Sequence, residues 1–123
     1  MSFSDKLADA RKSYPFETWA ARFGRGLDQY TPENVGLAKA IMDNLIVSLL
    51  AVGDEASDEV KISLIKESVE ALNDLHNQVN RELIETGERE ELCCLLDVIT
   101  EAVGLDADVY GVSVGIGSEW RDW

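Results

Sequence analysis

The chain has 123 residues, of which 46% are hydrophobic, and its 24 acidic and 11 basic side chains give a net charge of -13. This length and this apolar share predict one folded domain and exclude a disordered acidic tail. The negative field repels nucleic acid and anionic membranes, so we expect neither as a partner, and it favours a basic protein partner.

The first 30 residues are nearly neutral, with five basic and four acidic side chains, and they predict one or two short helices. Phe3 and Leu7 give the opening a weakly amphipathic pattern, and no continuous apolar core of a signal peptide is present. Pro15 ends this first helix, because proline cannot continue the hydrogen-bond ladder. Residues 17–23 predict a second short helix, and Phe16, Trp19 and Phe23 form an aromatic face that we expect to dock on the later helices.

Residues 32–52 carry the clearest helix signals in the chain. Thr31 can cap the helix, Pro32 suits its first position, and Gly53 suits the left-handed conformation that ends helices. The second half is apolar nearly all round, so we expect it either in the middle of a bundle or against a second subunit. Its most apolar run, residues 45–52, is far shorter than the ~20 residues that span a bilayer, which predicts a core helix.

Residues 58–86 predict the longest helix, on which the other elements pack. Apolar residues recur there every three or four positions, at Ile62, Ile65, Val69, Leu72, Leu75, Val79 and Leu83. Beside this stripe lies a row of polar residues, Asn73, His76, Asn77 and Asn80, which we call the polar row. Asparagine is a poor residue for a helix interior, so the polar row indicates either buried hydrogen bonds between helices or a recognition face.

A third main helix is predicted over residues 88–103, after which the chain changes character. Residues 105–123 alternate valine and isoleucine with glycine and end in a tryptophan pair, Trp120 and Trp123. A lone strand would have no partner here, so we expect an irregular arm. The two tryptophans either close the core or anchor a partner.

The predicted fold class is therefore all-α, a single-domain helical bundle of three main helices with one or two short N-terminal helices and an irregular C-terminal arm. The predicted parts are residues 1–30 as the N-terminal helices, 31–104 as the helical core and 105–123 as the arm.

No pattern of residues points to catalysis or to a metal. His76 is the only histidine, and the Glu-x-x-His pairs of di-iron bundles are absent. Cys93 and Cys94 are adjacent, which disfavours a disulfide between them, and they fit compact apolar residues in a reducing cytosol. No cysteine-enzyme signature surrounds the pair. We therefore expect no enzyme activity, no catalytic residue, no metal and no cofactor, in a cytoplasmic protein.

Three segments of the C-terminal half carry a resemblance to known proteins: residues 72–75 (LNDL), 83–92 (LIETGEREEL) and 119–123 (EWRDW). In these segments the chain resembles small acidic all-helical bacterial proteins of uncharacterised function, some of which act as immunity partners of polymorphic toxins. The resemblance implies a binding protein, and it carries over no functional residue.

The sequence thus favours an acidic protein-binding module, with an immunity-type inhibitor of a basic bacterial toxin as its most specific form. One alternative is a homodimer with a structural role, joined through the apolar half of the helix at 32–52. Another is an enzyme or small-ligand binder with a pocket near His76. The candidate binding residues are Asn73, His76, Asn77, Asn80, Trp120 and Trp123.

Overall fold

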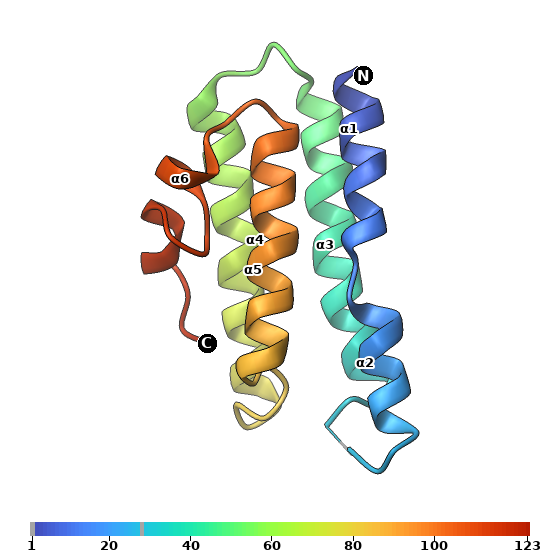
Figure 1. The fold of residues 1–123 in the computed structure, drawn as a ribbon. Coiled ribbons are helices and arrows are strands. Elements are labelled where there is room, and N and C mark those ends of the chain that lie inside the picture. The colour runs from blue at the N-terminus through green and yellow to red at the C-terminus, as the bar shows by residue number, and fades with distance from the viewer. Residues whose placement is uncertain (1, 28) are drawn as a thin grey trace.

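The structure, a computed structural model, describes residues 2–27 and 29–123 of the chain. Every regular element in these residues is helical (Figure 1), so the prediction of an all-α protein is confirmed. The elements in chain order are α1 (Phe3–Ala10), the 3-10 turn η1 (Arg11–Ser13), α2 (Phe16–Phe23), α3 (Pro32–Val52), α4 (Asp58–Gln78), α5 (Thr86–Ala102), α6 (Ala107–Tyr110) and the 3-10 turn η2 (Ile116–Glu119).

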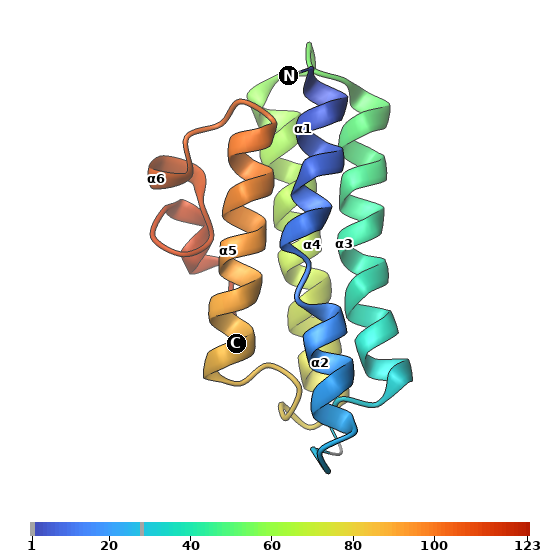
Figure 2. The same ribbon diagram turned by 45° about the vertical axis from the view of Figure 1, so that its right-hand side comes forward.

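The long helices run side by side in alternating directions (Figure 1 and Figure 2). α1 and α2 follow one another along one side of the molecule, and α3, α4 and α5 then each reverse direction. α3 packs against α4 and α2, and α1 packs against α5. The α3–α4 connection, the C-terminal end of α5 and the start of α1 therefore lie at the same end of the molecule.

α3 has the bounds that the sequence predicts, because both of its ends are marked locally. Thr31 Oγ1 accepts the N–H of Asn34 at 3.1 Å, and Pro32 occupies the first turn. Gly53 has a φ of 82° and ends the helix. The outer face of α3 is open to solvent, since Val47 is 57% and Leu50 40% exposed. α3 is also long and apolar enough to cross a membrane by length and composition, a property that core helices share.

α4 ends at Gln78, so the prediction of one helix over residues 58–86 is wrong in its last turns. The N–H of Arg81 donates to the carbonyl oxygen of His76 at 2.7 Å, and the N–H of Asn80 donates to that of Asn77 at 3.3 Å. These are the two bonds of a Schellman motif, in which Asn80 takes the left-handed position with a φ of 61°. The helix therefore ends at Gln78, although the apolar spacing continues to Val79 and Leu83.

Phe16 and Trp19 of α2 are buried in the core, as predicted, whereas Phe23, the third aromatic residue of the predicted face, is 40% exposed. Phe16 meets Tyr14 and Trp19 edge to face, with ring centroids 5.1 and 5.2 Å apart. Trp19 and Tyr30 are at most 1% exposed. Pairs of this geometry contribute about 0.5–1.5 kcal/mol beyond the area that they bury. They order the start of α2, which packs against α3.

The irregular arm after α5 is folded back on itself and contains no strand in the described residues 105–123. Val112 is fully buried, whereas Val114 is 73% exposed. Gly111 lies so close to Ala107 that a Cβ would stand 2.2 Å from the carbonyl oxygen of Ala107. Only glycine fits there, and it allows the chain to turn tightly after α6.

Candidate functional site

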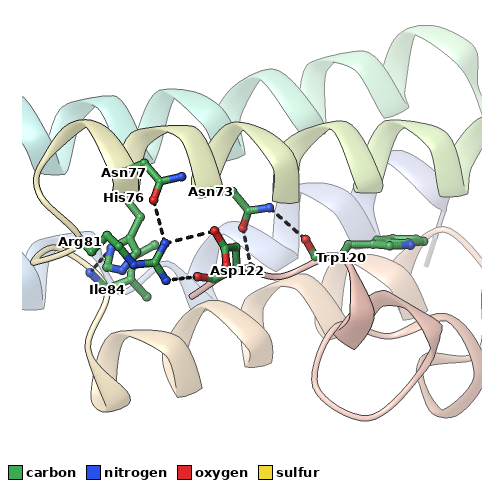
Figure 3. A network of polar contacts seen from close by, with 7 residues as sticks. All are labelled: Asn73, His76, Asn77, Arg81, Ile84, Trp120 and Asp122. Atoms are coloured by element: carbon green, nitrogen blue, oxygen red, sulfur yellow. Dashed lines mark hydrogen bonds and ion pairs between the residues drawn. The ribbon is translucent and has the colours of Figure 1, made fainter.

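Asn73 on α4 binds the end of the C-terminal arm. Its Nδ2 donates to the carbonyl oxygen of Trp120 at 2.9 Å, and its Oδ1 accepts the N–H of Asp122 at 2.9 Å (Figure 3). A primary amide carries donor and acceptor side by side, so one asparagine can satisfy both groups of a passing backbone. Asn73 thus connects two segments of this chain.

His76 fixes the loop between α4 and α5. The imidazole is 4% exposed, and its Nδ1 accepts the N–H of Ile84 at 3.1 Å. Burial and the positive charge of Arg81 lower the pKa of His76, while the carboxylate of Asp122 acts in the opposite direction. The neutral ring suits this role, because Nδ1 can accept a hydrogen bond only without a proton.

Arg81 joins the polar row to the arm, and sequence reasoning missed it. Its guanidinium donates to Asn77 Oδ1 at 2.7 Å and to the Asp122 carboxylate at 3.1 Å, and it also contacts the carbonyl oxygen of Asp122 (Figure 3). The signal that could have found it is Asn80, since an asparagine that ends a helix turns the next residue away from the helix axis.

Trp120 and Trp123 are half-buried and pack against the core. The guanidinium of Arg121 lies over the Trp123 ring, 5.5 Å from its centroid, and Arg121 Nε donates to the carbonyl oxygen of Val112 at 3.2 Å. Within the part of the chain that the structure describes, the buried indole N–H of Trp123 has no hydrogen-bond partner. Trp120 lies on the arm side of the network in Figure 3.

The structure therefore brings Asn73, Asn77 and Trp120 into one network, through Arg81 and Asp122. His76 and Asn80 instead shape the loop that follows α4. A role for the six candidate residues in binding a partner stays a prediction.

Cys93 and Cys94 have different environments on α5. Cys93 is buried and Cys94 exposed, and burial raises the pKa of the Cys93 thiol. Both line a depression of about 410 Å³ with Arg89 and Arg121. No group of three or more His, Cys, Asp or Glu side chains that could hold a metal ion occurs among residues 2–27 and 29–123.

The acidic residues at the start of α5 are largely engaged within the chain. Glu88 is 5% exposed, and its carboxylate accepts the N–H of Glu85 at 3.1 Å in a capping box and pairs with Arg22. Glu91 accepts from Arg22 at 3.1 Å and from Trp19 Nε1 at 3.3 Å. These carboxylates therefore attach α2 to α5 and offer little negative charge to a partner.

A second set of carboxylates lies toward the opposite end of α5 and is exposed to solvent. Some of them also have partners within the chain: Glu101 accepts the N–H of Ala107 at 3.0 Å, Asp106 accepts that of Asp108 at 2.9 Å, and Asp54 lies 3.9 Å from Lys61 Nζ. Lys61 is 4% exposed, and its Nζ donates to the carbonyl oxygens of Asp54 at 2.8 Å and Val103 at 3.1 Å. This lysine holds the α3–α4 connection against the end of α5. Seven exposed carboxylates belong to these two segments, and we call them the acidic end: Asp54, Glu55, Asp58, Glu59, Glu101, Asp106 and Asp108.

Comparison of the chain with protein-family models, with curated proteins and with solved structures gave no match.

Proposed function

We propose that this chain is an acidic protein-binding module, a single-domain helical bundle whose partner is a basic protein. The most specific form of the proposal is an immunity-type inhibitor that neutralises a basic toxin in the cytoplasm. The acidic end carries the proposal, because seven exposed carboxylates gather there on two segments tied together by one buried lysine.

Such a surface favours rapid and selective association with a basic partner. Asp58 and Glu59 begin α4, and Asp106 and Asp108 begin α6, where negative charge favours the helix dipole. Like charges kept close together also repel, so the surface remains strongly negative. Against a basic surface the same charges steer the encounter and can raise the association rate to about 10⁸–10⁹ M⁻¹s⁻¹ at low salt. Both cysteines are free, which agrees with a reducing compartment.

Affinity purification from the native host with a matched pair of variants tests the proposal. One bait carries Glu55→Gln, Glu59→Gln and Asp108→Asn in the acidic end, and the control bait carries Glu17→Gln, Glu82→Gln and Glu119→Gln, which are exposed residues elsewhere. The two baits have the same net charge. We expect the wild type and the control to capture a basic protein that salt elutes, and the acidic-end variant to lose it.

Equal capture by the two variants would show that the acidic end is not the binding surface. Capture of no basic protein by the wild type, including the product of the neighbouring gene supplied in excess, would contradict the proposal itself.

A structural homodimer is the second candidate, and one observation favours it. Val47 and Leu50 stand 57% and 40% exposed on the outer face of α3, where a second subunit would cover them. Sedimentation of the wild type and of a Val47→Gln, Leu50→Gln variant tests it. A wild type that stays monomeric at high concentration would remove this candidate.

A further inference from the structure

A groove runs along the surface between α3 and α4. Two neighbouring depressions of about 150 and 320 Å³ share Ile41, Asn44 and Ala71 as lining residues. Leu37 lines one and Leu64 the other, and Asp74 lies on the same wall as Ala71. We call this surface the α3–α4 groove. The α4 wall, from residue 64 to residue 78, is about 20 Å long at the helical rise, which matches about four turns of a partner helix.

The α3–α4 groove is lined by apolar residues that are only partly covered, together with polar ones such as Asn44, Ser48 and Ser68. Ile41 and Leu64 are half-buried, and Leu37 at its edge is 45% exposed. Val60 lies one turn before Leu64 on the same face of α4 and is 41% exposed. Apolar residues that line a depression are better placed to receive a side chain than isolated ones on a convex surface.

The two walls of the α3–α4 groove differ in charge. On α4, Glu67, Glu70 and Asp74 are exposed and share one helix face. The residues of α3 that line the groove are all uncharged: Leu37, Ala40, Ile41, Asn44, Leu45 and Ser48. Neither depression is lined by a lysine or an arginine. Val60 lies outside the two depressions, between Leu64 and Glu59 of the acidic end.

We propose that the α3–α4 groove is a docking site for an amphipathic helix of the partner, with an apolar stripe on the floor and lysine or arginine along the edge that faces α4. The inference rests on the proposed function and names the partner segment. Helices bind apolar grooves in this way through anchors at positions i, i+3, i+4 and i+7. A second copy of this chain fits poorly, because each copy carries a net charge of -13.

The test uses two designed peptides and a matched pair of protein variants. The first peptide, of about 18 residues so that it can form a helix, has leucine on one face and lysine on the other. The second replaces every lysine with glutamate. The groove variant carries Leu37→Gln, Glu67→Gln and Asp74→Asn, and its control carries Val114→Gln, Glu17→Gln and Glu82→Gln, all at exposed positions.

Fluorescence anisotropy measures the affinity of each labelled peptide, and circular dichroism checks that each variant is folded. We expect the lysine peptide to bind the wild type and the control with equal affinity and the groove variant about tenfold more weakly. We expect the glutamate peptide to bind none of the three proteins. Shifts in ¹⁵N amide spectra should map along both walls of the groove.

Three results would overturn the inference. If the acidic-end variant weakens binding and the groove variant does not, the peptide lies at the acidic end and the proposed function stands without the groove. If the lysine peptide does not bind at all, the groove is not a helix site, and the affinity purification decides the proposed function separately. If the wild type sediments as a dimer that the groove variant abolishes, the occupant is a second copy.

Discussion

Two members of the polar row, Asn73 and His76, bind main-chain groups through their side chains, which accounts for asparagine and histidine at helical positions that disfavour them. Asn73 binds two backbone groups of the arm, His76 binds one in the following loop, and Asn80 ends the helix. The bonding partners of Asn73 lie 47 and 49 residues away in the sequence. Residue type could therefore mark these positions as unusual, but it could not identify what they bind.

Replacing Asn73 with alanine should loosen the arm. One part-buried and one exposed hydrogen bond are lost, and water can replace the partner, so we expect a loss of about 0.5–1.5 kcal/mol in the free energy of unfolding. Urea unfolding measures the loss, and hydrogen exchange at the Asp122 amide should become faster. Gln78→Ala, at an exposed position of α4, is the control and should change stability by less than about 0.5 kcal/mol. Unchanged exchange at Asp122 would contradict the docking role.

His76 should make stability depend on pH just below neutrality. Because its pKa in the folded chain is lowered from the ordinary value, the unfolded chain takes up the proton first as the pH falls. The stability that neutral His76 contributes is therefore fully present above the ordinary pKa of about 6.5 and is lost as the pH falls below it.

His76→Asn provides the measurement, since its side-chain oxygen can accept from Ile84 but does not titrate. We expect the free energy of unfolding of the wild type to exceed that of the variant at about pH 7.5, and this difference to be smaller at about pH 5.5. Other titrating groups, including Asp122, are common to both proteins and cancel in the difference. An advantage of the same size at both pH values would argue against the lowered pKa.

At the scale of elements, local signals decided which helix ends could be predicted. α3 begins and ends as predicted, because a threonine cap, a proline and a glycine act within their own turns. The prediction extended α4 too far, because Val79 and Leu83 continue the apolar spacing after the chain has left the helix. Asparagine at the left-handed position was the only local sign of that end, and it is weaker than glycine.

Lys61 connects elements that the sequence alone does not place together. Lys61→Met keeps the apolar part of the side chain but leaves the carbonyl oxygens of Asp54 and Val103 without their donor. We expect it to lower the free energy of unfolding by about 2–3 kcal/mol. The control is Lys66→Met, at an exposed position of the same helix, which should cost less than about 0.5 kcal/mol. Equal effects of the two substitutions would show that the contacts of Lys61 do not hold the acidic end together.

At the scale of the whole molecule, apolar spacing predicted the helical class and composition predicted the negative field, but neither predicted where the field is strongest. The sequence contains two acidic segments, near residues 54–59 and 88–91, and does not show which of them forms the more negative surface. Packing separates them, because Glu88 and Glu91 are engaged with Arg22, whereas the first segment stays exposed beside the end of α5. That distinction depends on the contact between α2 and α5, which no local pattern encodes.

The excess of negative charge should make the folded state more stable as salt is added. Ion pairs such as Arg22–Glu88 and Arg81–Asp122 weaken with screening, but 24 acidic side chains face only 11 basic ones, so repulsion dominates the sum. Thermal melts from about 10 mM to 300 mM NaCl, where the Debye length falls from about 30 Å to below 10 Å, should show a rising Tm. The acidic-end variant, with three fewer charges, should rise less. A Tm that falls with salt would mean that the ion pairs outweigh the repulsion, and the exposed carboxylates would then give no electrostatic reason to expect a basic partner.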